Sequence, residues 1–332
     1  MNVLVAGGAG YIGSHTVKSL VAAGHSPVIY DNFDRGHREI PKLLNVPAVD
    51  GELDDSFTLK EALVDHKIEA VMHFAAYAYV GESVHQPLMY YHNNVSTTIN
   101  VLETMLDADV RKFVFSSTCA TYGDPDTVPI TEDESKKPVS PYGRSKWMVE
   151  QILMDLAAAR KDFKFAALRY FNASGCALDG VIGEDHDPET HLIPVILQTI
   201  LGVKDKITVF GTDYPTPDGT NVRDYIHVED LADAHIKAMQ KLDTHQTIQC
   251  NLGTGNGFSV KQIIEAVEKV TGKKVPVEYG PRRSGDAIAL WANPKKAKDL
   301  LGWEAKHKDP ETIIRSAWNW FQKHPTGYAS GK

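Results

Sequence analysis

Residues 3–13 read Val3-Leu4-Val5-Ala6-Gly7-Gly8-Ala9-Gly10-Tyr11-Ile12-Gly13. This apolar run and glycine turn continue into an amphipathic segment, and a second apolar run over residues 27–30 ends at Asp31. The order of strand, glycine turn, helix, strand and acid is typical of a βαβ unit that binds a dinucleotide. We therefore predict that the chain begins with such a unit.

The three spaced glycines each have a predicted role in this unit. Gly7 permits the tight turn, Gly10 lets the backbone approach a pyrophosphate, and Gly13 lets the helix pack closely on the strand. The first turn of the helix then presents free N–H groups and a positive dipole to the phosphates.

The acid at the end of the second strand bears on which dinucleotide is bound. Asp31 can accept hydrogen bonds from an adenosine ribose and would repel a 2′-phosphate, so the sequence favours NAD over NADP. Two arginines in the following loop, Arg35 and Arg38, leave NADP open.

Length, net charge and cysteine content exclude several other classes of protein. A chain of 332 residues suggests about two domains. With 35 basic and 43 acidic residues the net charge is −8, which argues against a nucleic-acid or anionic-membrane partner. We find neither an apolar run of ~18 residues that could span a membrane nor a signal-peptide pattern. Cys119, Cys176 and Cys250 are dispersed, which favours reduced thiols in a cytoplasmic protein, and the histidines show no ligand spacing, so no metal is expected.

Helical and extended patterns alternate through the first half of the chain. Helices are predicted over residues 57–66, 84–108 and 141–160, and strands over residues 46–49, 70–74, 112–115 and 163–169. This alternation indicates an α/β fold, a Rossmann-type doubly wound parallel sheet covered on both faces. Because ligands of such sheets bind beyond the carboxyl ends of the strands, functional residues should follow these strands.

After residue 170 the pattern becomes less regular. Residues 172–189 and 211–222 are rich in Gly, Asp and Pro, and single helices alternate with short strands. We predict a dinucleotide-binding domain over residues 1–170 and a smaller mixed α/β substrate domain over residues 171–332. The chain is expected to return to the first domain around residues 224–251.

Tyr142 and Lys146 form the predicted chemical centre. They lie four residues apart, so they project from one face of a helix that begins at about residue 141. A tyrosine with a pKa of about 10 is a poor base at neutral pH, and a nearby ammonium would lower that pKa and could also bind a cofactor ribose. Thr118, at the end of the preceding strand, would place a hydroxyl near the reacting oxygen; the alternative is an ordinary strand-end cap.

These motifs, with several in the second half, resemble the extended short-chain dehydrogenase/reductases and, more closely, the UDP-glucose (UDP-galactose) 4-epimerase family. The resemblance covers nearly the whole chain. It is carried by residues 7–13, 73–76, 80–84, 91–94, 142–146, 168–172, 210–215, 222–228 and 281–286. The second-half motifs are the specific part, because the first half would fit many enzymes of sugar nucleotides.

The resemblance implies residue roles. Tyr142 would be the acid/base, Lys146 would tune it and bind the ribose, and Thr118 would be the catalytic hydroxyl. The implied NAD-binding residues are Gly7, Gly10, Tyr11, Ile12, Gly13, Asp31, Asn32, Glu52, Leu53, Phe74, Ala75, Ala76, Asn94, Ser116, Tyr142, Lys146 and Tyr170. The implied UDP-sugar-binding residues are Thr118, Tyr142, Asn172, His191, Leu192, Val209, Phe210, Arg223, Arg283, Asp286 and Leu290.

The implied activity is inversion at C4 of UDP-glucose and UDP-galactose through a transient 4-keto sugar, with NAD bound tightly throughout. A homodimer is also implied, formed through the helices over residues 84–108 and 141–160. Three positions depart from the family pattern: Ala78 in place of a lysine, Glu52 in place of an adenine-binding aspartate, and His191 in place of a UDP-binding asparagine.

Two kinds of alternative remain open. Nucleotide-sugar 4,6-dehydratases and UDP-glucuronate decarboxylases share the first half, but they carry a carboxylate after or near the strand-end threonine, where this chain has Cys119-Ala120-Thr121. A catalytically silent NAD-sensing scaffold protein is the non-enzymatic alternative, and the intact Tyr142 and Lys146 argue against it.

Leu290 bears on substrate breadth. In the family, the residue four after the acid of a Gly-Asp pair lies beside the C2 substituent of the sugar, and Gly285-Asp286 sets that register here. Tyrosine restricts members to the non-acetylated sugars and a small residue admits the N-acetylated ones. Leucine is intermediate in size, so we expect partial exclusion of N-acetylated substrates, unless Leu290 only packs beside Trp291.

Overall fold

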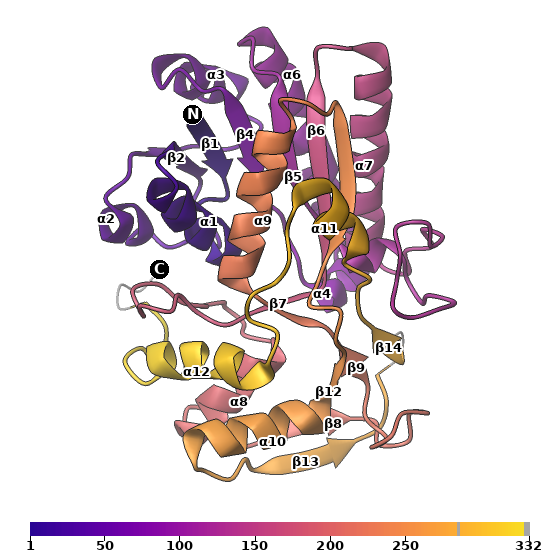
Figure 1. The fold of residues 1–332 in the computed structure, drawn as a ribbon. Coiled ribbons are helices and arrows are strands. Elements are labelled where there is room, and N and C mark those ends of the chain that lie inside the picture. Colours follow the sequence, from indigo (N-terminus) through magenta and orange to yellow (C-terminus); the bar gives the residue numbers. More distant parts are fainter. Residues whose placement is uncertain (284–285, 329–332) are drawn as a thin grey trace.

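The computed structural model describes residues 1–283 and 286–328, and a parallel β-sheet dominates its N-terminal half (Figure 1). Within the described residues this sheet has seven strands in the order β11-β6-β5-β4-β1-β2-β3. Their bounds are β1 (Asn2–Ala6), β2 (Ser26–Asp31), β3 (Ala48–Asp50), β4 (Ala70–His73), β5 (Lys112–Thr118), β6 (Lys164–Tyr170) and β11 (Thr247–Leu252). The predicted Rossmann-type doubly wound sheet is confirmed.

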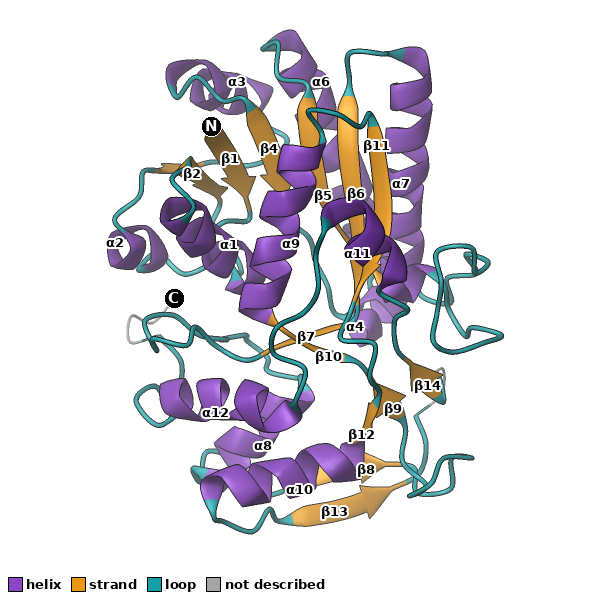
Figure 2. Cartoon of the chain, in the orientation of Figure 1, coloured by secondary structure: helices purple, strands orange, loops and turns teal. Residues whose placement is uncertain are grey.

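Alternate residues of each central strand face opposite layers of helices. Val3 and Val5 of β1 pack with helices α1 and α9, whereas Leu4 packs with α3, α6 and α7 (Figure 2). Because both faces are covered, the strands are apolar throughout, as expected for a parallel sheet. The helices span α1 (Tyr11–Ala22), α3 (Ser56–Asp65), α6 (Thr97–Asp107), α7 (Pro141–Ala159) and α9 (Val228–Lys241).

The single helix predicted over residues 84–108 is wrong. The structure divides this region into α4 (Val80–His85), α5 (Pro87–Tyr91), a π-helical turn (His92–Ser96) and α6. Pro87 disfavours helical backbone at Gln86, which adopts φ −126° and ψ 55°. The π turn contains Asn94, whose side chain bonds the backbone N–H and C=O of Tyr77 at 2.9 and 3.0 Å. Helix interruptions of this kind are frequent at functional sites.

The described residues of the second half form three small sheets and a separate core. The strand pairs are β7 (Asn172–Ser174) with β10 (Tyr225–His227) and β8 (Ile207–Phe210) with β13 (Val277–Gly280), and the third sheet joins β9 (Val222–Arg223), β12 (Phe258–Ser259) and β14 (Ala289–Leu290). Ile196, Ile263 and Trp320 are buried between α8 (Leu192–Ile200), α10 (Val260–Thr271) and α12 (Pro310–Phe321), in the lower part of Figure 2. The remaining helices are α2 (Ile40–Leu44), the 3-10 turn Cys119–Thr121 and α11 (Lys295–Leu301).

The chain returns to the large sheet after it has entered this second region. Strand β10 pairs with β7, α9 then covers the large sheet, and β11 pairs with β6 along its whole length. Asp224 holds the crossing, because its buried carboxylate accepts hydrogen bonds from the N–H groups of Thr254, Gly255 and Ala292 at 2.9–3.2 Å.

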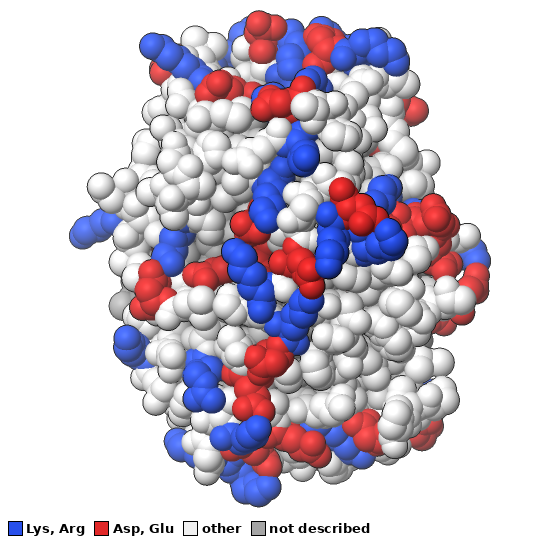
Figure 3. Space-filling model, viewed as in Figure 1, with Lys and Arg blue, Asp and Glu red and all other residues white. Residues whose placement is uncertain are grey.

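The viewed surface carries basic and acidic side chains interspersed, without a broad area of one sign (Figure 3). Among the described residues, no helix has the length and apolar character needed to cross a bilayer.

Buried histidines make the stability of the fold depend on pH. His73, at the end of β4, is fully buried, and burial lowers the pKa of its imidazole to about 3. Because this folded pKa lies below the unfolded value of about 6.5, the unfolded chain binds more protons between those values, and stability is lost as pH falls. His73 alone should cost about 2 kcal/mol of unfolding free energy between pH 7.5 and 5.

Thermal melts of wild type and His73→Gln at those two pH values check this expectation. The variant should lose less Tm on acidification than wild type does, by about 3 °C. An equal loss in both proteins would show that His73 titrates normally.

Candidate active site

The glycine turn has the geometry that a dinucleotide site requires. Gly7 has φ +76°, and a Cβ there would lie 2.5 Å from the backbone nitrogen of Ala75. A Cβ on Gly13 would lie 2.1 Å from the carbonyl oxygen of Gly7, so α1 could not approach β1 as closely. Helix α1 begins after Gly10 without a side-chain cap, which leaves first-turn N–H groups available to an anion.

Nine of the expected cofactor residues line one pocket beyond the carboxyl ends of β1, β2 and β4. They are Gly7, Gly10, Asp31, Asn32, Glu52, Leu53, Phe74, Ala75 and Ala76. The same pocket is lined by Arg35, which the sequence analysis named as leaving NADP open, and by residues that it missed, among them Tyr30, Tyr77, Asn93 and Thr97. These residues are chemically suited to NAD, because the glycine turn offers N–H groups to a pyrophosphate and Asp31 offers an acceptor to a ribose.

Asp31 is buried beneath this pocket. Its carboxylate accepts the N–H groups of Ala9 and Phe33, both at 2.9 Å, and burial raises its pKa. Arg35 is engaged elsewhere: it pairs with Glu82 at 3.4 Å and lies 5.3 Å from the Tyr77 ring centroid. Arg35 thus lines the pocket with its guanidinium already paired with a carboxylate, so its presence does not by itself indicate a 2′-phosphate.

The three expected catalytic residues lie together at the carboxyl end of β5. Thr118 ends that strand, and its hydroxyl accepts the Ala120 N–H at 3.1 Å, so it does cap the following turn. A hydrogen bond between the Thr118 and Tyr142 side chains also acts to lower the Tyr142 pKa. Lys146 is buried and donates to the carbonyl of Ser116 at 3.0 Å.

The pKa values of this trio differ from the sequence prediction. In the protein chain alone, burial raises the pKa of Tyr142 to about 12 and lowers the pKa of Lys146 to about 7. Desolvation disfavours the charged form of each group, and it outweighs the attraction that the i, i+4 spacing predicts. The i, i+4 spacing alone therefore does not lower the pKa of Tyr142.

The other expected cofactor residues lie around this trio. Ser116 and Tyr170 are joined through their hydroxyls, and Asn94 donates to the Ser145 hydroxyl at 3.1 Å. Tyr11 and Ile12 lie in the first turn of α1, where the Tyr11 hydroxyl donates to the Gly175 carbonyl at 2.5 Å. This bond connects the glycine turn to the segment that follows β7.

The expected sugar-nucleotide residues fall into two groups. The first lies near the catalytic trio: Asn172 begins β7, and Arg223 is opposite Leu290 in the β9–β14 pair. Leu290 is half-buried against a small cluster that includes Tyr122 and Phe171.

The second group lies farther along, near β8. The Arg283 guanidinium lies 4.9 Å from the Phe210 ring centroid and bonds Asp286 at 2.9 Å. Val209 is buried in the second core, so its side chain is not available to a substrate. Gly285 lies outside the described residues.

His191 and Leu192 lie at the start of α8. The His191 Nδ1 atom is 2.9 Å from Oε1 of Glu189 and 3.5 Å from Oε1 of Glu184, so this ring is held by carboxylates. His186 joins the same group, and these four residues form a cluster that the sequence analysis did not anticipate.

Residues 3–253 match the NAD dependent epimerase/dehydratase family, and the chain belongs to this family. It is 50% identical to the UDP-glucose 4-epimerase of Lactobacillus helveticus over 331 residues, 99% of each chain. Identity at this level over the full length places the chain among the UDP-glucose 4-epimerases, which confirms the resemblance.

Solved structures agree in fold and in sequence. A UDP-glucose 4-epimerase from Stenotrophomonas maltophila, with bound NAD and formylated UDP-arabinopyranose, is 42% identical, covers 98% of both chains and has a TM-score of 0.95. The UDP-Glc/GlcNAc 4-epimerase of Campylobacter jejuni is 40% identical over 97% of this chain and 99% of that chain, with a TM-score of 0.85. The protein is thus an NAD-dependent epimerase.

Proposed function

We propose that this protein interconverts UDP-glucose and UDP-galactose by inverting C4 of the hexose. The observation that carries the proposal is the trio of Thr118, Tyr142 and Lys146 at the end of β5, beside the dinucleotide pocket. The turn that follows Thr118 is Cys119–Thr121, without the carboxylate that elimination or decarboxylation chemistry would use. This composition favours epimerisation over the dehydratase and decarboxylase alternatives.

The side chains of the trio move and hold protons. Tyr142, as a phenolate, takes the proton of the sugar 4-hydroxyl and later returns it, while Thr118 hydrogen-bonds the reacting oxygens. Lys146 stabilises the phenolate and binds the nicotinamide ribose. NAD, held beside Lys146, would supply the reversible hydride chemistry that inversion at C4 requires.

The UDP portion anchors the substrate through residues remote from C4. Asn172, Arg223 and Arg283 would bind it, because arginine matches a diphosphate as a planar fork of donors. Affinity supplied far from the reacting carbon leaves the sugar ring free to turn between the two hydride transfers. No net oxidation occurs, so NAD stays bound.

The proposed function is tested by incubating purified protein with UDP-galactose without added NAD. We expect UDP-glucose to form until both sugars are present at equilibrium. A dehydrated 4-keto-6-deoxy sugar, a pentose product or no turnover would each overturn the proposal.

Asp31 is expected to select NAD. Asp31→Ala should weaken NAD retention about 10- to 100-fold, because a charge-assisted hydrogen bond to the ribose is lost, and should reduce discrimination against NADP. Nucleotide released by denaturation and titration of the stripped protein measure both effects. Asp34→Ala, in the same pocket, is the control and should retain NAD; extraction of NADP from wild type would contradict the assignment.

Leu290 is proposed to limit substrate breadth. Its half-buried position opposite Arg223 supports a place beside the sugar, although packing against Tyr122 alone is the competing explanation. Bulk discriminates by only ~1–3 kcal/mol per group, so wild type should prefer UDP-glucose over UDP-N-acetylglucosamine about 10- to 200-fold.

The kcat/KM ratio for the two substrates is compared in wild type, Leu290→Tyr and Leu290→Ala. Tyr should raise the ratio and Ala should lower it, each by about tenfold. A ratio unchanged in both variants would show that Leu290 only packs.

We also assign residues 1–170, together with β11, to NAD binding and most of residues 171–332 to UDP-sugar binding.

A homodimer through α4–α7 is supported by exposed apolar side chains there, of which Leu88 is 81% and Val84 59% exposed. Three free cysteines support a reducing, cytoplasmic location.

A further inference from the structure

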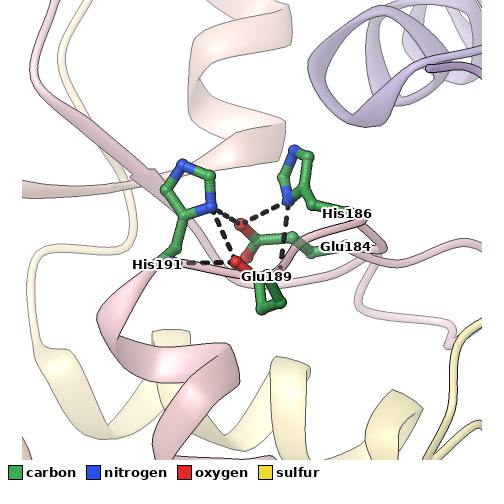
Figure 4. Close-up of side chains that lie close together, drawn as sticks. All are labelled: Glu184, His186, Glu189 and His191. Atoms are coloured by element: carbon green, nitrogen blue, oxygen red, sulfur yellow. Dashed lines mark hydrogen bonds and ion pairs between the residues drawn. The ribbon is translucent and has the colours of Figure 1, made fainter. Parts of the chain in front are cut away.

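The segment before α8 brings together two Glu-x-His pairs. Glu184 and His186 form the first pair, and Glu189 and His191 the second (Figure 4). One ligand atom from each residue lies within 4.8 Å of all the others. In Figure 4 both imidazoles turn Nδ1 toward the carboxylates and the other ring nitrogen away from them.

One carboxylate oxygen of Glu184 is buried without a hydrogen bond among the described residues. Its side chain is 2% exposed, and among the described residues its Oε1 atom has no hydrogen-bond partner. That atom points between the two rings, 3.5 Å from Nδ1 of His186 and 3.5 Å from Nδ1 of His191. Glu189, 4% exposed, lies on the other side of the same space. Two carboxylates buried together need a compensating positive charge.

The spacings between these atoms are compatible with an ion between them. The Nδ1 atom of His186 is 3.3 Å from Oε2 of Glu189, a long hydrogen bond, so three of the four His–Glu distances are 3.3–3.5 Å; Glu189 contacts His191 through its other oxygen, Oε1. Metal bonds of about 2.0–2.2 Å give a tetrahedron with edges of about 3.3–3.6 Å, whereas N–H···O bonds centre near 2.9–3.0 Å. The fourth distance, 2.9 Å between His191 Nδ1 and Glu189 Oε1, is a hydrogen bond that an ion would replace.

We propose that Glu184, His186, Glu189 and His191 bind one divalent transition-metal ion, with zinc the favoured ion. Two imidazoles and two carboxylates suit a borderline metal in tetrahedral coordination, and two carboxylates balance its charge. Because the protein supplies all four ligands, the site is structural. The Glu189 carboxylate also accepts the backbone N–H of His191 at 2.7 Å, which orients it.

The ion would fix the segment between β7 and α8 against the cofactor half. The His186 ring lies 5.7 Å from the Tyr11 ring at the glycine turn and 6.4 Å from the Tyr79 ring. His191 would then bind the ion through Nδ1. Its side chain is 42% exposed, so its other ring nitrogen stays available to the proposed UDP-sugar. The ion takes no part in the proposed proton and hydride chemistry, and it shares only His191 with the proposed substrate site.

Metal content tests the proposal directly. Protein purified without a metal-binding tag and incubated with Zn²⁺, then passed through a desalting column, should retain about one zinc per chain by mass spectrometry, and EDTA should lower its Tm. Glu184→Gln should reduce retained zinc at least tenfold and make Tm insensitive to EDTA. The alternative is that a proton on Glu184, and not a metal ion, stabilises the cluster. Because Gln has the same shape as a protonated Glu, the Tm of Glu184→Gln would then equal that of wild type, and wild type would retain no zinc.

A second histidine group supplies the matched control. His307 lies near His227 and Glu229, but the His227 nitrogens are already bonded to Ser316 and the Glu229 N–H. His307→Asn should keep the zinc, and His186→Asn should lose it. Less than a tenth of a zinc per wild-type chain, or zinc lost with His307→Asn but kept with His186→Asn, overturns the proposal.

Discussion

Tyr142→Phe should lower kcat by at least ~10²-fold while the protein keeps its fold and its NAD. Only one hydroxyl is removed, and that hydroxyl is the proposed proton acceptor beside Thr118. The ring remains in place against Tyr90, whose centroid lies 6.5 Å away. Turnover of UDP-galactose, extracted NAD and Tm are measured on the same preparation, so a loss of cofactor cannot be mistaken for a loss of chemistry.

The same substitution at Tyr90 is the control. Its hydroxyl donates to Glu82 at 2.8 Å and lies 2.8 Å from the Tyr79 carbonyl, so it is occupied by structural partners. Tyr90→Phe should change kcat by less than about tenfold. Near-normal turnover in Tyr142→Phe would end the assignment of Tyr142 as the acid/base.

Glu150→Leu should destabilise the protein by about 3–5 kcal/mol. The Glu150 carboxylate is fully buried in α7 and binds the Arg169 guanidinium of β6 at 2.5–3.1 Å. It also accepts the Ser117 hydroxyl at 2.5 Å. Removing the carboxylate leaves the Arg169 charge buried without a counterion, and the urea midpoint of unfolding should fall accordingly.

The double variant Glu150→Leu/Arg169→Met tests whether the loss of stability comes from the unpaired charge on Arg169. With both charges replaced by apolar groups, most of the lost stability should return, because a buried pair is worth little relative to hydrophobic packing. A double variant less stable than Glu150→Leu would show that the two residues do not act as a pair.

The sheet could be predicted from the sequence because local signals specify it. The apolar runs of β1, β2 and β5 alternate with amphipathic segments, and a glycine turn or a polar residue follows each strand. Such patterns can be recognised from the local periodicity of apolar residues alone, without knowledge of distant contacts. The region of the dinucleotide pocket could be predicted for the same reason, since strand ends in a parallel sheet converge, whereas the individual pocket residues came from the family resemblance.

Features that depend on distant partners could not be predicted. The π turn forms because Asn94 bonds Tyr77 and Ser145, which are remote in sequence. Arg35 forms an ion pair with Glu82, and no sequence pattern predicts that pairing. The pKa values of Tyr142 and Lys146 follow from burial, and spacing along one helix carries no information about burial.

The late return of the chain through α9 to β11 has a consequence for dividing this protein into pieces. A fragment that ends at residue 170 contains the glycine turn, Thr118, Tyr142 and Lys146, but it lacks the strand that pairs with β6 from Phe165 to Tyr170. It also lacks α9, so one apolar face of the sheet would be open to water. Bare strand edges and exposed apolar faces promote aggregation. We therefore expect that residues 1–170 cannot be excised, transplanted or fused as an autonomous module by cutting the gene once.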